Sequence, residues 1–196
     1  MNAYPLNVNI KSAAEYFGSL IQKPRQGSFK VYVGRVPVGQ LFGMIVEEGI
    51  QLSAIGLNVA AALNDVNVST NERQLNVIPA REVVFKEKIY REVDYEEIQK
   101  CSPDILLIDD LLHANIGDIQ PEFRYKNVKN YLSHGISVIS TIYSPWDDNL
   151  RKILSYLGNG IAIPVDRWAE LSDDEVVALV FTPKEAFSHA ELISVN

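Results

Sequence analysis

The segment Phe29–Ile50 constrains the fold of this chain more than any other part of its sequence. Its first residues are mostly β-forming and end at Gly34. Pro37 and Gly39 then mark a tight turn, and apolar residues recur from Leu41 at the three-to-four spacing of a helix face. The pattern predicts a strand, a turn and a helix, which is the repeating unit of α/β proteins.

The turn has the glycine spacing of a phosphate-binding loop without its charged side chains. In the motif G-x-x-x-x-G-K-[ST], backbone N–H groups hold the phosphates, the lysine contacts the outer phosphates and the hydroxyl binds Mg²⁺. Here Gln40 occupies the lysine position and Leu41 the hydroxyl position. The candidate nucleotide-binding residues are Gly34, Arg35, Val36, Pro37, Val38, Gly39, Gln40 and Leu41. We expect a degenerate site with weak or absent Mg-ATP binding.

Composition excludes several classes of function. The chain has 196 residues, of which 47% are hydrophobic, enough to bury a full core. Its formal net charge of -7 argues against nucleic acid as a partner, and its single cysteine excludes an internal disulfide. It lacks both an apolar run of about 18 residues and a signal-peptide pattern. We therefore expect a cytoplasmic protein that does not insert into a membrane.

Strand-like and helix-like segments alternate along most of the chain. The predicted strands after the first are Leu57–Leu63, Val77–Ile78, Val83–Phe85, Asp104–Asp110, Ile136–Thr141, Ile161–Val165 and Val176–Phe181. The predicted helices are Asp94–Cys101, Pro121–His134, Pro145–Leu157 and a last one after Thr182. This order predicts an open, mostly parallel sheet with helices on both faces, similar to P-loop NTPases. We assign residues 28–196 to this α/β domain and residues 1–27 to an N-terminal helical extension.

Two adjacent carboxylates follow the most apolar of these strands. Asp109 and Asp110 come directly after Ile105–Ile108, a run that fits a strand covered on both faces. Ligands of open parallel sheets bind at the carboxyl ends of the strands. The pair is therefore a Walker B-like candidate, with Asp109 placed to hold Mg²⁺ through water and Asp110 to polarise an attacking water. The alternative is a structural role as the N-cap of the next segment.

From Phe29 to about Phe187 the sequence resembles the N-terminal cytoplasmic domain of the KdpD osmosensitive potassium-channel sensor histidine kinases. The most specific match is Ile108–Asn115, which is similar to the family's VDELAHTN. Val33–Leu41 corresponds in position to the family's GAAPGVGKT loop, His134–Tyr143 to its AGIDVYTTLN and Ile163–Asp166 to its VPD-type strand end. Of the family's His-Pro-Lys-Arg-Trp stretch, Gln120–Tyr125 keeps the proline and a basic and aromatic character.

The resemblance implies a signal-transduction role in potassium homeostasis, with a protein partner or self-association. It also assigns His113, Asn115 and Arg124 to the loop beside the acidic pair. The kinase region of the family is not matched, so we expect no phosphoryl transfer to histidine by this chain alone. Without the P-loop lysine and hydroxyl, a bound triphosphate would lack about two charge-assisted contacts. The binding free energy would then be weaker by several kcal/mol, on the order of two such contacts.

These observations leave three hypotheses. The first is a non-catalytic regulatory module with no catalytic residue, no metal site and no assigned cofactor. The alternative is a divergent nucleotide-binding protein in which backbone amides of the turn hold a phosphate and Arg35 or Arg124 supplies charge. The third is an enzyme that uses His113 or His134 with the aspartates, but no Ser/His/Asp or metal-ligand spacing supports it.

Overall fold

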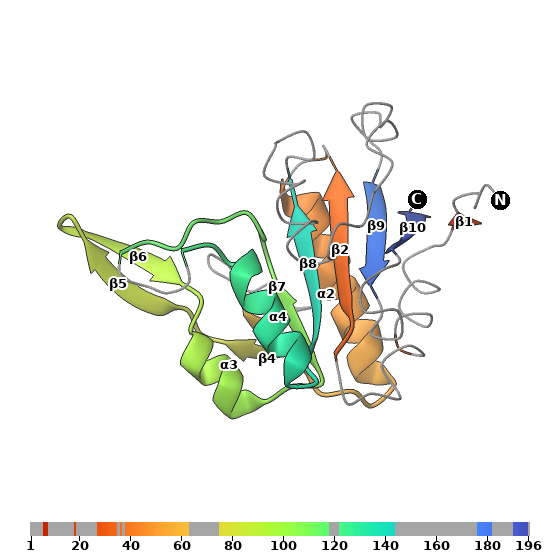
Figure 1. Cartoon of the computed structure of the whole chain (residues 1–196), viewed down its shortest axis with the longest axis horizontal. Helices are drawn as coiled ribbons and strands as arrows, with labels where there is room; N and C mark the ends of the chain where they lie inside the picture. Colours follow the sequence, from red (N-terminus) through yellow and green to blue (C-terminus); the bar gives the residue numbers. More distant parts are fainter. Residues whose placement is uncertain are drawn as a thin grey trace.

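A computed structural model describes residues 6–7, 18, 27–34, 36, 38–62, 75–117, 122–143, 176–181 and 190–195. Within these residues the main element is an eight-stranded sheet in the order β1-β10-β9-β2-β8-β7-β3-β4 (Figure 1). Its strands are β1 (Leu6–Asn7), β2 (Phe29–Gly34), β3 (Val59–Ala62), β4 (Asn76–Ile78), β7 (Ile105–Ile108), β8 (Ser137–Ile142), β9 (Val176–Phe181) and β10 (Ala190–Val195).

The central part of the sheet is parallel. Strands β2, β8, β7, β3 and β4, in this order, pair in parallel with one another. Strand β9 pairs antiparallel with β2 and with β10, and β1 joins the outer edge of β10. The mostly parallel α/β fold expected from the alternation of segments is confirmed.

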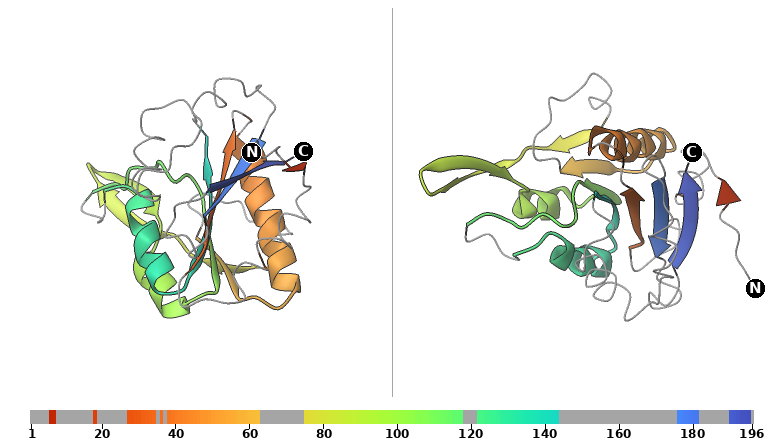
Figure 2. Two further views of the ribbon diagram at one scale, coloured as in Figure 1. Left: turned by 45° about the vertical axis from the view of Figure 1, so that its right-hand side comes forward. Right: turned by 90° about the horizontal axis from the view of Figure 1, so that it is seen from above.

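Helices cover both faces of this sheet (Figure 2). Helix α2 (Val38–Ala54) lies on one face, and helices α3 (Tyr95–Cys101) and α4 (Tyr125–Ser133) lie on the other. Asp94 caps α3 through its side chain, which accepts hydrogen bonds from two backbone N–H groups of the first turn. The sequence therefore predicts the start of α3 correctly.

Glycines end the two longer helices as expected. Gly56 and Gly135 have φ values of +96° and +81°, which favour glycine because a Cβ is disfavoured there. After α2, Leu57 donates to the Leu52 carbonyl, and the matching bond after α4 runs from Ile136 to the Tyr131 carbonyl. Both are Schellman ends, which satisfy carbonyls that have no partner within the helix.

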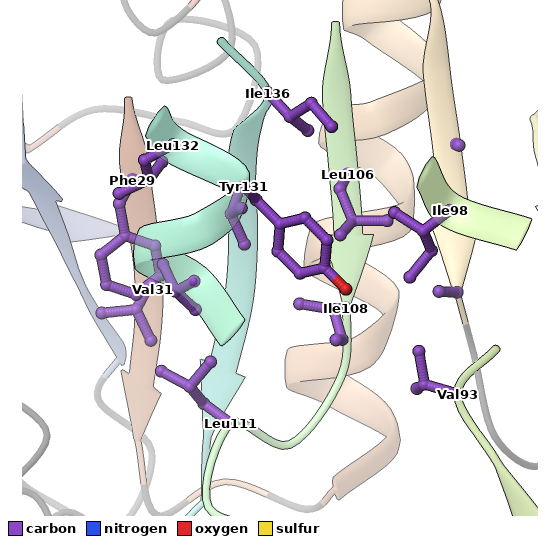
Figure 3. Close-up of a cluster of buried hydrophobic side chains, with 14 of the residues drawn as sticks. Phe29, Val31, Val93, Ile98, Leu106, Ile108, Leu111, Tyr131, Leu132 and Ile136 are labelled. Atoms are coloured by element: carbon purple, nitrogen blue, oxygen red, sulfur yellow. The ribbon is translucent and has the colours of Figure 1, made fainter. Parts of the chain in front are cut away.

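Two apolar clusters hold the layers together. Val128, Tyr131 and Leu132 form the buried stripe of α4, as predicted, and are at most 3% exposed. Figure 3 shows Tyr131 and Leu132 directed toward the strands that carry Phe29, Val31, Leu106 and Ile108. The second cluster, under α2, contains Tyr32, Leu41, Ile45, Ile105 and Leu107. The β7 run is buried on both faces, as its unbroken apolar sequence predicts.

A buried ion pair interrupts the second cluster. The Nζ of Lys30 lies 2.8 Å from Oε1 of Glu48, and the Tyr32 hydroxyl donates to Oε2 of Glu48 at 2.7 Å. All three residues are fully buried. Burial lowers the pKa of Lys30, and the contact with Glu48 acts in the opposite direction.

Two details differ from the sequence-based expectation, and two predicted segments are not tested. Helix α4 begins at Tyr125 rather than at Pro121, because Phe123 instead forms an antiparallel bridge with Ala114. Strand β10 was not predicted, and neither was β6 (Lys88–Glu92). The predicted segments Pro145–Leu157 and Ile161–Val165 lie outside the described residues.

Strand β6 pairs with β5 (Arg81–Phe85) in a two-stranded hairpin that projects from the side of the molecule (Figure 1). Lys86 and Glu87 form its turn with φ values of +49° and +64°. Positive φ at both central residues is the geometry of a type I′ turn, which usually contains Asn or Gly. The absence of those residues explains why the turn is difficult to recognise in the sequence.

Candidate functional site

The candidate site lies at the carboxyl edge of the parallel strands. Strand β2 ends at Gly34 and helix α2 begins at Val38, while Asp109 and Asp110 follow β7. Strand β8 lies between β2 and β7 in the sheet. Because the strands are parallel, the turn and the acidic pair lie at the same edge, as expected for a ligand site. Arg35 and Pro37 are outside the described residues.

The candidate turn residues at the start of α2 differ in their exposure to solvent. Gly39 and Gln40 are exposed, whereas Val36 is 5% exposed and Leu41 is completely buried. Leu41 belongs to the apolar cluster under α2. The Leu41 side chain therefore packs inside the protein.

Asp109 makes hydrogen bonds with three other side chains. One oxygen of its carboxylate accepts hydrogen bonds from the hydroxyls of Thr141 and Tyr143, which lie at the end of β8. Its backbone carbonyl accepts a bond of 2.7 Å from Nη1 of Arg124. Burial raises the pKa of Tyr143, and its bond to Asp109 acts in the same direction. Tyr143 is therefore a stable hydrogen-bond donor, and Asp109 is oriented by the neighbouring strand.

Asp110 has a different environment. Its φ of +44° places it in the left-handed region, and its backbone N–H donates to the Thr141 hydroxyl at 3.0 Å. Burial raises the pKa of its carboxyl group, and the charge of Arg124 opposes that shift. Asp109 contributes a smaller increase and His113 a smaller decrease. The two adjacent carboxylates are thus distinguished by their surroundings.

Arg124 connects the acidic pair to the hairpin. Its side chain is 1% exposed, and its Nη2 lies 3.6 Å from a carboxylate oxygen of Glu92, the last residue of β6. Its Nε is buried without a hydrogen-bond partner among the described residues. The guanidinium therefore lies between the Asp109 backbone and the base of the hairpin.

Glu92 is the centre of a second set of contacts. It is fully buried, and its carboxylate accepts hydrogen bonds from Nε2 of His113 at 3.0 Å and from the backbone N–H of Ile116 at 3.2 Å. The acceptor-only carboxylate assigns the proton to Nε2 of His113, whose side chain is 27% exposed. These bonds join the base of the hairpin to the loop that follows the acidic pair.

Asn115 stabilises the same loop. Its side-chain amide and the Tyr95 hydroxyl exchange hydrogen bonds of 3.0 and 3.2 Å, which join the loop to α3. Its backbone N–H donates to the Glu122 carbonyl at 2.8 Å, beside the bridge between Ala114 and Phe123. Asn115 is nearly buried and acts as an anchor within the protein.

The structure brings together several residues that the sequence singled out and adds others. The loop after β7 contains Asp109, Asp110, His113 and Asn115, and Arg124 lies beside it. Sequence reasoning did not assign Glu92, Thr141 or Tyr143 to it. Thr141 and Tyr143 could have been found, since they end the parallel strand next to β7. Glu92 has no local signal, because its partners His113, Ile116 and Arg124 all lie at least 21 residues further along the chain.

No group of three or more His, Cys, Asp or Glu side chains in the described ranges is arranged to hold a metal ion. Among the same residues, no helix combines the length and apolar character needed to cross a lipid bilayer.

Fold and site together define a mostly parallel α/β module with an acidic pair at the carboxyl edge of its sheet. The chain belongs to the KdpD family, described as the osmosensitive K+ channel His kinase sensor domain, whose model matches residues 25–154. This confirms the resemblance inferred from the motif at Ile108–Asn115. The chain is therefore a sensor-type signalling module.

Several relatives of this chain are named as KdpD sensor proteins. The chain is 32% identical over 167 residues to the putative sensor protein KdpD of Synechocystis sp., covering 82% of this chain and 45% of the relative. It is 29% identical over 123 residues to the sensor protein KdpD of Mycobacterium tuberculosis and 25% identical over 141 residues to that of Escherichia coli. The matches cover 14% and 15% of those two relatives. The chain thus spans less than half the length of each.

Proposed function

We propose that this chain is a regulatory sensor module of the cytoplasm whose phosphate-binding turn no longer supports Mg-ATP chemistry. The observation that carries the proposal is the complete burial of Leu41 at the position where a P-loop places its metal-binding hydroxyl. Gln40, at the lysine position, is exposed and carries no charge. A triphosphate at this turn would therefore lack both groups that normally neutralise it.

The acidic pair supports the same proposal. One oxygen of Asp109 is already bonded to two hydroxyls, and Arg124 donates to its backbone. This set of contacts orients Asp109 as part of the β7–β8 edge. In our proposal the Walker B-like pair stabilises the loop of His113 and Asn115, and signalling depends on the position of that loop. The names of the relatives suggest an input linked to potassium or osmotic conditions and a protein partner in that pathway.

A divergent nucleotide-binding function remains the second candidate. The observation in its favour is the exposed start of α2, where a Cβ added at Gly39 would meet no other described part of the chain within 4 Å. Backbone N–H groups at such a helix start can hold a phosphate without a lysine. In this alternative the module binds a nucleotide weakly and does not hydrolyse it.

Calorimetric titration of the chain with ATP, ADP and cyclic dinucleotides, with and without Mg²⁺, tests both candidates. We expect no Mg²⁺-dependent ATP binding by the unmodified chain. The Gln40→Lys variant returns the ammonium to the turn, and Gln99→Lys adds the same charge at an exposed position of α3.

If the turn still holds a phosphate, Gln40→Lys should bind ATP about tenfold more tightly than Gln99→Lys, because the new ammonium adds one charge-assisted contact to the phosphate. If the cradle is lost, both variants behave like the unmodified chain. ATP hydrolysis by the unmodified chain at the rate of an ordinary ATPase would contradict the proposal.

A further inference from the structure

The β5–β6 hairpin has one partly covered face and one bare face. Opposite residues of an antiparallel pair share a face, and faces alternate along each strand. Val83 and Tyr90 are paired and half-buried. On the same face, Val83 and Phe85 lie against Gly117, within 4 Å of where a Cβ would stand. This face is therefore partly covered by the loop that follows the acidic pair.

The other face is apolar at its centre and exposed. Val84 and Ile89 are directly paired across the strands, and they are 74% and 67% exposed. Two-stranded hairpins are marginally stable in water, and β-branched pairs of this kind are usually covered. No segment of the described part of the chain covers this pair. We call the surface formed by Glu82, Val84, Ile89 and Arg91 the hairpin face.

The charges of the hairpin face are arranged in a self-complementary way. Glu82 and Arg91 are paired across the strands, one step from the apolar pair. A two-fold rotation about an axis parallel to the strands places a second hairpin on the first with β5 over β6. Each Glu82 then faces the partner's Arg91, and each Val84 faces the partner's Ile89. A two-fold interface requires such a patch, because the same surface serves both copies.

We propose that the hairpin face is a docking surface for the hairpin face of a second copy of this chain. The proposal names a partner for the regulatory module, but it does not depend on whether the turn at α2 binds nucleotide. The patch is much smaller than the roughly 800 Å² per partner of a stable interface, so association by this surface alone is weak and reversible. Its dissociation constant then lies in the range of about 0.1 to 1 mM.

Sedimentation equilibrium of the full chain at increasing concentration measures this association. We expect Ile89→Ser to weaken it about tenfold, because the two-fold axis removes the apolar contact twice. The matched control is Lys88→Glu, also exposed and on β6 but directed to the other face. The control should associate as the unmodified chain does.

Charge exchange tests the symmetry. The variants Glu82→Arg and Arg91→Glu each place like charges opposite one another in a homodimer, and each should associate about tenfold more weakly than the unmodified chain. In an equimolar mixture of the two variants, every introduced charge meets an opposite charge on the other variant. The mixture should therefore regain the affinity of the unmodified chain.

Recovery in the mixture separates an interface from a damaged hairpin, because mixing cannot repair a defect inside one chain. An unmodified chain that stays monomeric up to about 1 mM would overturn the proposal and leave the face for a different protein. Equal association by Ile89→Ser and the unmodified chain, or no recovery in the mixture, would also overturn it.

Discussion

Two glutamates in the described part of the chain are fully buried, and they differ in what surrounds them. Glu48, in the middle of α2, contacts Lys30 and Tyr32, which both come from β2. Glu92, at the end of β6, contacts His113, the backbone of Ile116 and Arg124. The first set joins two regular elements of the core. The second joins the hairpin to a loop and to the start of α4.

The difference separates a structural cluster from one suited to signalling. Lys30, Tyr32 and Glu48 are all inaccessible to water, so their contacts can change only when the core opens. In the Glu92 cluster, His113 reaches the surface, and Arg124 also contacts the backbone of Asp109. A change at the acidic pair can therefore reach the hairpin without disturbing the core.

Lys30→Met should cause the largest loss of stability. It leaves the buried carboxylate of Glu48 without its cation, and breaking a buried pair costs about 3–5 kcal/mol. Urea denaturation of the variant measures this loss. The double variant Lys30→Met/Glu48→Gln should recover most of it, since Gln keeps an acceptor for the Tyr32 hydroxyl and removes the uncompensated charge. A loss below about 1 kcal/mol for the single variant would contradict the structural role of the pair.

Arg124→Met should cost less, about 2–3 kcal/mol, because Glu92 keeps its bonds to His113 and Ile116. Lys126→Met is the control on the same helix. Lys126 forms an exposed pair with Glu122, so its loss should cost under about 0.5 kcal/mol.

Hydrogen exchange sharpens this prediction. In Arg124→Met, amides of Lys88–Glu92 and Ile116 should exchange faster while those of β2 do not, because local opening then involves the hairpin alone. Faster exchange throughout the sheet would contradict the separation of the two clusters.

Asp110→Asn should have the smallest effect, and its size depends on pH. Burial raises the pKa of Asp110 in the folded chain above its ordinary value of 3.8. Ionisation is therefore less favourable in the folded chain, and this residue reduces stability as pH rises through its folded pKa. Asn tolerates the positive φ and does not ionise. The variant should gain under about 1 kcal/mol at pH 7, because the carboxylate is only half-buried, and nothing at pH 3. A gain that is equal at both pH values would show that the backbone, not ionisation, is responsible.

Much of the fold could be predicted because its signals are local. The N-cap at Asp94, the glycines after α2 and α4 and the unbroken apolar run of β7 each act over a few residues. The hairpin could not be predicted in the same way. Its turn residues, Lys86 and Glu87, have side chains that rarely adopt a positive φ, so no local preference marks the turn.

For the candidate site, the sequence by itself determined the acidic pair after β7 and the absence of a lysine and a hydroxyl after Gly39, since these are matters of residue type and spacing. Only the tertiary structure decided which groups those residues meet. The parallel pairing of β7 with β8 brings Thr141 and Tyr143 to Asp109, and the hairpin brings Glu92 to His113 and Arg124. Such contacts join residues that are distant in the chain, and they form because the sheet fixes the positions of its strand ends.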